Sequence, residues 1–406
     1  MFRKVKHLRL KEENKEYCME SRNFNIGSLV YSGSVKDIFT FEDNSNSLVF
    51  LFSDRYSVFD WGEMPDLLEK KGDSLAHMGK IFFNYLGSTK SWKNWNLPQN
   101  VLENLGSDAQ DVLEELREKG VNHHCQGAVD KKNNSLLVSK VNVPSLPFID
   151  GVYQYDHYTQ KVENTLVPLE VIFRFGVPAG ASILKRVNDE SYLSELGLRT
   201  KPKEGDRFEC PLIEFSTKLE NTDRYLGKEE AKTISGMTNQ EFKDLHILTT
   251  IVACRLRDFF KSLGITLWDG KFEWSFSKIY NGKRGLLMVD SIGPDELRLE
   301  AFGQKLSKEF LRSFYRDSEW LQAVEKGKLI ATERNDNDWK RIVTDELKVQ
   351  PGPLEKNYKS VANSLYLTLA NACSKEMNLS IPFEGAMGLE ELCMEMKNLE
   401  ESRRLE

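Results

Sequence analysis

The chain has 406 residues, of which 40% are hydrophobic and 11% aromatic, so it can bury one large core or two to three adjoining cores. Its 56 basic and 62 acidic residues are mixed along the whole length and leave a formal net charge of −6. This balance excludes the basic surface that nucleic-acid binding requires, so nucleic acid is not an expected partner.

The amino-terminal residues 1–17 are charged throughout and lack the apolar stretch of a signal peptide, and no run of 18 apolar residues follows. We therefore expect a cytoplasmic protein that does not contact a membrane. His123 and His124 are adjacent, point in different directions and have no third ligand at helical or hairpin spacing, so no metal site is expected there. The six cysteines form no C-x-x-C pair and are interpreted as reduced thiols: they are Cys18, Cys125, Cys210, Cys254, Cys373 and Cys393.

Residues 27–53 predict a small antiparallel meander of three strands, GSLVYS, VKDIFTF and SLVFLFS. Gly33 and Lys36 lie in the first turn. A glycine-containing hairpin with a lysine can cover nucleotide phosphates, although the same residues suit an ordinary hairpin. Residues 74–87 then place their apolar side chains on one helical face and predict a helix.

Residues 92–120 are polar and helix-prone, and Ser107 could cap a short helix that ends at Gly120. We interpret this segment as an insertion or a lid. Strands are predicted at 136–143 and 167–175, and a polar loop at 187–208 is a candidate boundary between domains.

The clearest helix is predicted at 239–263, with Thr238 and Glu241 as a capping box and Gly264 at its end. Two strand-like runs follow, ITLWDGKFEWSF and GLLMVDSIG, joined by a β-hairpin turn at Asn281–Gly282. The tail from about 305 to 406 is charged and predicted to be mostly helical.

Alternation along the strand 265–276 places Lys271, Glu273 and Ser275 on one face. Hairpin pairing could bring Asp290 beside Glu273, so that two carboxylates and a lysine converge. Such a set can hold Mg²⁺, which accepts one or two carboxylates together with nucleotide phosphate oxygens, while the lysine contacts the phosphates. The alternative is an exposed strand face with a structural ion pair.

The segment EVIFRFGVPAGASILKR places Arg174 in an apolar strand, before a turn with Ser182 and the basic pair 185–186. A guanidinium, a hydroxyl and backbone amides suit a sugar phosphate, although a capped turn with solvated basic residues explains the same pattern. Arg298, which follows a Gly-Pro turn, could bind an anion or a surface carboxylate. No protein-kinase, P-loop or G-x-S-x-G motif is present.

Taken in order, these segments resemble the phosphoribosylaminoimidazole-succinocarboxamide synthase family, and the resemblance runs nearly end to end. The segments that carry it are YSGSVKDIF, FSDRYSVFD, KKGDSL, EVIFRFGVPAGASILKR, IEFSTKLENTDRYL, GITLWDGKFEWSF, VDSIGPDELRL and GPLEKNYKSVANSLYLTL.

The resemblance implies an α+β fold with a kinase-like antiparallel sheet, an ATP-grasp-like part and carboxy-terminal helices. It implies three regions, at 1–165, 166–305 and 306–406. It also implies a ligase of purine biosynthesis with ATP and Mg²⁺. In this reaction ATP phosphorylates the carboxylate of 5-amino-4-carboxyimidazole ribotide, and the amine of L-aspartate then displaces phosphate to form an amide. No covalent enzyme intermediate is expected.

The same resemblance implies site residues. Gly33 and Lys36 would lie over the ATP phosphates, and Lys271, Glu273 and Asp290 would hold nucleotide, with the two carboxylates as Mg²⁺ ligands. The remaining positions are Arg174, Ser182, Arg298 and Lys218 for the ribotide, Lys218, Asp223 and Arg174 for catalysis, and Ser57, Asp60 and Lys71 as weaker matches.

The chain departs from the family pattern at several positions. Ser291 replaces the acidic residue that follows the metal aspartate, Glu300 replaces an aromatic residue, and the turn at 174–182 is longer. These departures leave two alternatives open, a ligase for a different acid or amino acid and a catalytically silent nucleotide-binding homologue. Retention of the lysines and carboxylates above argues against a silent protein. A homo-oligomer is compatible with the sequence.

Overall fold

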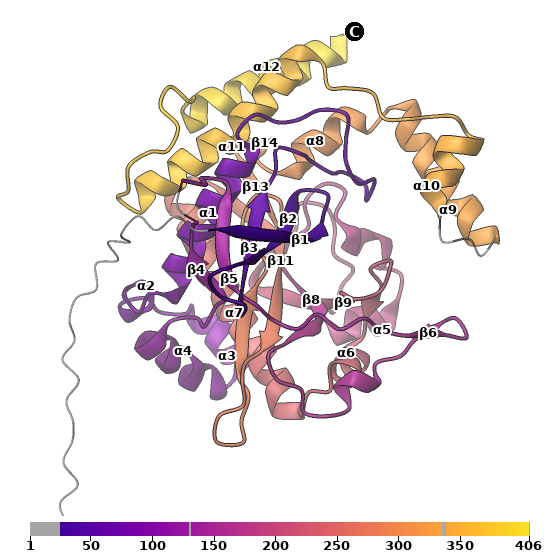
Figure 1. The fold of residues 1–406 in the computed structure, drawn as a ribbon. Coiled ribbons are helices and arrows are strands. Elements are labelled where there is room, and N and C mark those ends of the chain that lie inside the picture. Colours follow the sequence, from indigo (N-terminus) through magenta and orange to yellow (C-terminus); the bar gives the residue numbers. More distant parts are fainter. Residues whose placement is uncertain (1–24, 130, 335, 337, 406) are drawn as a thin grey trace, which may run out of the picture.

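The computed structural model describes residues 25–129, 131–334, 336 and 338–405. Two antiparallel sheets form the centre of the molecule and helices surround them (Figure 1). This arrangement confirms the predicted α+β class, with an amino-terminal antiparallel sheet and carboxy-terminal helices.

The first sheet has the strand order β1-β2-β3-β5-β4 and contains the predicted amino-terminal meander. Its edge strand β1 pairs with β2, and the register of β2 against β3 places Lys36 opposite Phe52. The strands are β1 (Ile26–Ser32), β2 (Lys36–Phe41), β3 (Ser47–Phe52), β4 (Cys125–Gly127) and β5 (Ser135–Ser139).

The second sheet has the order β10-β9-β8-β11-β13-β14, with β12 paired to β11. Asn281 and Gly282 both have positive φ, 49° and 74°, which is the conformation of a type I′ hairpin turn and confirms the predicted hairpin. The strands are β8 (Thr165–Gly176), β9 (Arg207–Thr217), β10 (Tyr225–Leu226), β11 (Thr266–Phe276), β12 (Leu286–Val289), β13 (Leu297–Ala301) and β14 (Gln304–Lys305).

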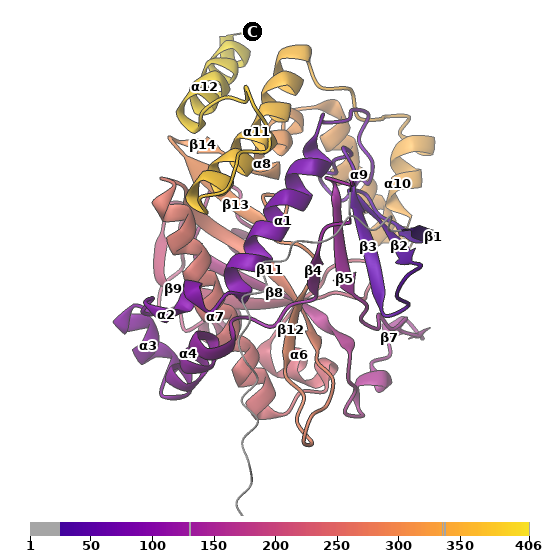
Figure 2. The same cartoon turned by 60° about the vertical axis from the view of Figure 1, so that its left-hand side comes forward.

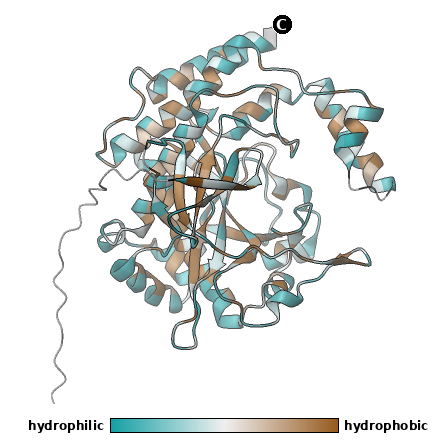
Figure 3. Ribbon diagram, viewed as in Figure 1, coloured by the Kyte–Doolittle hydropathy of each residue, from teal (hydrophilic) through white to brown (hydrophobic). Residues whose placement is uncertain are grey.

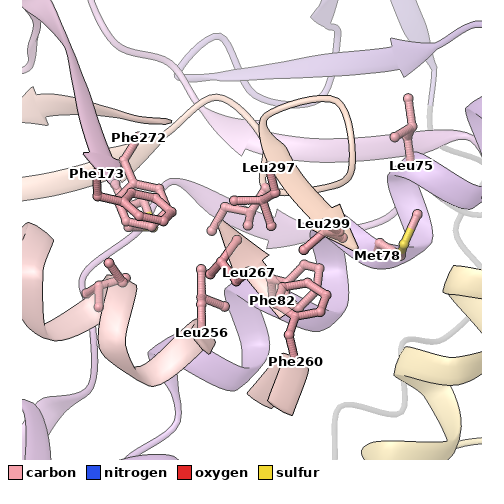
Figure 4. Close-up of a cluster of buried hydrophobic side chains, with 14 of the residues drawn as sticks. Leu75, Met78, Phe82, Phe173, Leu256, Phe260, Leu267, Phe272, Leu297 and Leu299 are labelled. Atoms are coloured by element: carbon pink, nitrogen blue, oxygen red, sulfur yellow. The ribbon is translucent and has the colours of Figure 1, made fainter. Parts of the chain in front are cut away.

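Two long helices pack against these sheets. Helix α7 (Asn239–Ser262) begins at the predicted capping box, in which Thr238 Oγ1 accepts the Glu241 N–H at 3.2 Å and the Glu241 carboxylate accepts the Thr238 N–H at 2.9 Å. Helix α1 (Lys71–Gly87) begins slightly earlier than predicted. Phe82 of α1 and Phe260 of α7 lie 5.5 Å apart between ring centroids, in the cluster that Figure 4 shows. The sheets are therefore joined to the helices by one apolar layer.

Residues 90–120 form three short helices, α2 (Lys90–Lys93), α3 (Gln99–Leu105) and α4 (Asp108–Lys119). Ser107 does not cap α4: its backbone is already helical and its side chain accepts no backbone N–H. Gly120, with φ 70°, ends the helix as predicted. Trp92 is fully buried and donates to the Leu86 carbonyl at 2.8 Å, and α4 contacts α7. The segment is packed on the body of the protein, which does not fit a lid.

The segment 187–208 is not only loop. It contains α5 (Glu190–Glu195), because the Asp189 carboxylate accepts the N–H groups of Ser191 and Tyr192 and caps a helical turn. A hairpin of β6 (Phe148–Ile149) and β7 (Val152–Tyr153) projects from the molecule (Figure 1).

The carboxy-terminal region is helical, as predicted, and lies across one end of the molecule (Figures 1 and 2). Buried side chains from all three predicted regions belong to one hydrophobic cluster, and apolar residues concentrate on the central strands (Figure 3). The division into domains therefore stays a prediction. The remaining helices are α6 (Lys228–Ser235), α8 (Lys308–Tyr315), α9 (Glu319–Arg334), α10 (Trp339–Arg341), α11 (Lys356–Glu376) and α12 (Leu389–Leu405), with short helical turns at Asp156–Tyr158, Ser182–Lys185 and Ile342–Glu346.

Within the described residues, no helix is both long and apolar enough to span a bilayer. Five of the six cysteines are described and all five are free thiols, whereas Cys18 lies outside the described residues.

Candidate functional site

A cluster of lysines and carboxylates forms where β8 and β11 run side by side. Glu170 of β8 is the direct cross-strand partner of Glu273 of β11, so two carboxylates face each other. Lys218, just after β9, lies 3.1 Å from Glu170 and 2.7 Å from Glu273, and Lys271 contacts both carboxylates as well. Two lysines thus neutralise two carboxylates that would otherwise repel each other.

The charges in this cluster stabilise each other despite burial. Burial by itself would lower the pKa of Lys271, but Glu273 and Glu170 raise it well above its usual value. Burial likewise opposes the charged form of Lys218, yet Glu273 and Glu170 raise its pKa. Both side chains are therefore positively charged and can bind an anionic ligand.

Lys36 and Asp290 connect the first sheet to this cluster. Lys36 begins β2 and its ammonium forms an ion pair with Asp290, which follows β12 directly. Burial would raise the pKa of Asp290, but Lys36, Lys218 and Lys271 lower it, so the carboxylate is ionised. Gly33 shapes the preceding turn: it donates to the Lys36 carbonyl at 2.9 Å, and a Cβ there would come equally close to that oxygen. We name Lys36, Glu170, Lys218, Lys271, Glu273 and Asp290 the lysine–carboxylate cluster.

Asp290 lies one residue beyond the position opposite Glu273. Val289, not Asp290, lies opposite Glu273. Strict alternation would then point Asp290 to the other face of the sheet. Asp290 has φ 67° instead, and this left-handed residue ends the strand and turns the chain. The carboxylate joins the lysines for that reason.

A second group of polar side chains surrounds Arg174. Asp269 of β11 lies directly opposite Arg174 of β8 and Arg298 of β13, so the three side chains share one row across the sheet. Arg174 donates to Asp269 at 3.0 Å, to the Ser182 hydroxyl at 2.9 Å and to the Tyr225 hydroxyl at 3.3 Å, and it also pairs with Glu214. We name these residues, including Arg298, the arginine cluster.

The two arginines of this cluster differ in availability. Arg174 is 3% exposed and its guanidinium is engaged on every side. Arg298 lies 3.5 Å from Asp269 and 3.6 Å from Glu309, and its buried Nη1 has no hydrogen-bond partner in the described part of the chain. Arg298 can therefore donate to a ligand, whereas Arg174 orients Ser182 and Tyr225.

The other predicted residues lie in different surroundings. Asp223 is exposed as a residue, but partial burial of its carboxyl group, followed by the charge of Glu170, raises its pKa to about 6. Asp60 is also exposed and its charge acts on Asp223, while Ser57 accepts the Gly62 N–H at 3.2 Å. Lys71 is fully buried and forms a 2.8 Å ion pair with Asp295, so its contacts are structural.

Several residues of the site were missed in the sequence. Glu170 was detectable, because it lies on the same strand face as Arg174 in an otherwise apolar run. Asp269 and Tyr225 gave no local signal, since they enter the arginine cluster only through strand register. The Nε2–H of His124 donates to the Asp290 carbonyl at 3.0 Å, so this nitrogen is engaged within the protein. Within the described residues no three His, Cys, Asp or Glu side chains are grouped as metal ligands.

Comparisons of the sequence with known proteins point to one family. Residues 29–327 match the family model described as SAICAR synthetase. A protein of Archaeoglobus fulgidus, provisionally named phosphoribosylaminoimidazole-succinocarboxamide synthase, is 32% identical over 351 residues, which cover 84% of this chain and 92% of that protein. The phosphoribosylaminoimidazole-succinocarboxamide synthase of Thermoplasma acidophilum is 28% identical, with 71% and 84% covered.

A likeness to solved structures supports the same fold. The SAICAR synthase of Saccharomyces cerevisiae, solved in complex with SAICAR, has a TM-score of 0.53 at 19% identity. The match covers 88% of this chain and 97% of that one.

Proposed function

The chain belongs to the SAICAR synthetase family, and from this premise we propose that the two clusters join the carboxylate of 5-amino-4-carboxyimidazole ribotide to the amine of L-aspartate at the expense of ATP. A carboxylate oxygen attacks the γ-phosphorus of ATP and ADP leaves. The amine nitrogen then attacks the acyl carbon, the C–O bond to phosphate breaks, and the nitrogen loses a proton. The products are the succinocarboxamide, ADP and phosphate.

The lysine–carboxylate cluster is proposed to bind the nucleotide. Lys36 and Lys271 each form an ion pair with a carboxylate in this structure, and their ammonium groups can transfer to phosphate oxygens when ATP enters. The transferring phosphoryl group needs no protein nucleophile, so the rate is expected to come from positioning and from charge neutralisation.

The carboxylates of Glu273 and Asp290 fit a magnesium ion. Both supply hard oxygen ligands, and Asp290 is ionised because the lysines lower its pKa. Mg²⁺ is usually held by one or two carboxylates together with substrate phosphates, so a third protein ligand is not required. Bound there, Mg²⁺ would neutralise charge on the phosphates during transfer.

The arginine cluster is proposed to bind the ribotide and its phosphate. Arg298 has a free N–H, and the Ser182 and Tyr225 hydroxyls, 2.9 Å apart, complete a set of donors. Arg174 is proposed as the positioning residue that holds both hydroxyls in place.

Asp223 is proposed as the base that accepts the amine proton. A carboxyl group with a pKa of about 6 is ionised at neutral pH and is a stronger base than an ordinary aspartate. Lys218, whose charge acts on Asp223, is proposed to lie against the acyl oxygen atoms and to favour the charge that develops there.

The observation that supports this function most directly is the Lys36–Asp290 ion pair beside Glu273 and Lys271. The test is ADP release by the purified protein with Mg-ATP, the carboxylated aminoimidazole ribotide and L-aspartate, with each component omitted in turn and the product identified by mass. We expect turnover only with the full set. ADP formation without the amide product, or with another amino acid in preference to aspartate, would overturn the substrate assignment.

A further inference from the structure

Glu296, in the loop between β12 and β13, has an acidic side chain that the proposed reaction does not yet use. The Ser291 hydroxyl donates to its Oε1 at 3.1 Å. The Glu296 carbonyl accepts the Lys271 N–H at 3.2 Å, so the residue lies against the lysine–carboxylate cluster. Its side chain therefore stands beside the residue that directly follows Asp290.

The neighbours of Glu296 are all engaged with other partners. Lys36 pairs with Asp290, whereas Lys71 and Lys308 lie 2.8 and 3.6 Å from Asp295. In the described part of the chain Glu296 forms no ion pair, and the serine hydroxyl is its side-chain donor. Burial, followed by the charges of Asp295 and Asp290, raises the pKa of Glu296 to about 7. A carboxyl group in this position lacks a cation of its own.

Nucleotide binding would change this balance. On the proposed function, the ATP phosphates draw the Lys36 ammonium away from Asp290. Asp290 then loses its direct ion-pair partner beside Glu296, which has none, and two carboxylates with less counter-charge attract a divalent ion more strongly. The acidic residue that the family pattern places after Asp290 is replaced by Ser291 in this chain. The Ser291 hydroxyl instead donates to the carboxylate of Glu296.

We propose that Glu296 is a positioning residue for the nucleotide-bound divalent cation, and that its carboxylate, held by Ser291, takes the place of the acid missing at position 291. This inference rests on the proposed function. Glu296 acts through Asp290 and Ser291 and raises the affinity for the cation. Its backbone bond to Lys271 does not depend on the side chain, so substitution of the side chain separates this role from a structural one.

The test compares Glu296→Gln with the double variant Ser291→Glu/Glu296→Gln. Glutamine keeps the size and removes the charge, and the double variant returns a carboxylate to position 291. Glu300→Gln is the matched control, because it makes the same change on the neighbouring strand, where the carboxylate accepts the Trp268 indole N–H at 3.1 Å.

The first readout is Mn²⁺ binding to the protein–ADP complex, followed by electron paramagnetic resonance in place of Mg²⁺. Glu296→Gln is expected to weaken Mn²⁺ binding about tenfold, because a charge is lost close to the ion. The double variant should recover most of this affinity, and Glu300→Gln should match the wild type. ADP binding without metal should be the same in all four proteins.

The second readout is the ligase rate as a function of Mg²⁺ concentration. Glu296→Gln should raise the concentration for half-maximal rate and leave kcat at saturating Mg²⁺ within about twofold. Unchanged Mn²⁺ affinity in Glu296→Gln, an equal loss in Glu300→Gln, or a fall in kcat without a shift in metal dependence would each overturn the proposal. Mn²⁺ binding needs neither ribotide nor aspartate, so a wild-type protein that binds Mn²⁺–ADP but forms no amide would refute the proposed function separately.

Discussion

Lys36 and Asp290, which are 254 residues apart in the chain, form an ion pair that joins β2 of the first sheet to the end of β12 in the second. The pair places a cation from the first sheet and an anion from the second sheet at one point.

Asp290→Asn should reduce ATP-dependent turnover by at least about 100-fold, because it removes a charge from the metal and phosphate site without changing the volume of the side chain. Asparagine also tolerates the left-handed backbone at this position, where φ is 67°. Asp150→Asn is the matched control, since Asp150 has φ 51° but lies in the exposed hairpin. Steady-state kinetics check both variants, and full activity in Asp290→Asn would refute the metal assignment.

Asp223 should determine the acidic limb of the pH–rate profile. Its pKa is raised to about 6, so protonation below that pH removes the proposed base and kcat should fall as the pH decreases. Asp223→Asn should lower kcat strongly and abolish this limb. Rates measured between pH 5 and 8 at saturating substrates test the assignment, and an unchanged limb in the variant would assign the ionisation to another group.

Arg298→Lys should raise the KM for the ribotide about tenfold and leave the KM for ATP within about twofold, because lysine lacks the second N–H arm that a phosphate accepts. Arg312→Lys is the control, since Arg312 also pairs with Glu309 but lies outside the arginine cluster. Equal changes in both variants would indicate that Glu309, rather than a ligand, explains the effect.

Asp295→Asn should destabilise the protein by about 3–5 kcal/mol, because it leaves the fully buried Lys71 ammonium without its 2.8 Å partner. The exposed pair Lys397–Glu401, at 3.8 Å, provides the comparison, and Glu401→Gln should change stability by less than about 0.5 kcal/mol. Urea unfolding measures both free energies. Similar values for the two variants would show that the buried pair is not a tertiary anchor.

His124 should make stability depend on pH. Burial lowers its pKa to about 3 in the folded protein, against an ordinary value of 6.5, so the unfolded chain takes up a proton first as the pH falls. The free energy of unfolding should therefore decrease by about 1.4 kcal/mol per pH unit from this residue below pH 6.5. His124→Gln keeps a donor for the Asp290 carbonyl and should flatten that slope. The midpoints of urea unfolding, measured at pH 7.5 and 5.5 for the wild type and the variant, test this prediction. An equal decrease in both proteins would contradict it.

Local patterns in the sequence were sufficient to predict the main helices and strands. The meander at 27–53, the helix at 239–263 with its Thr238–Glu241 capping box, and the hairpin turn at Asn281–Gly282 are confirmed. Each depends on side-chain periodicity or on residues that favour one backbone conformation within a short window. Where such signals are weak, as at Ser107 and in the segment 187–208, the prediction was wrong.

The sequence by itself determined the fold class, the family and the strand face that carries Lys271 and Glu273, because alternation and motif order are properties of neighbouring residues. Tertiary structure decided which charges meet. Arg174 finds Asp269 and Glu214 through the register of three strands, and Asp290 reaches Lys36 because a left-handed residue ends β12. Ion pairs between distant segments require sheet order and register, and both depend on how the whole chain packs.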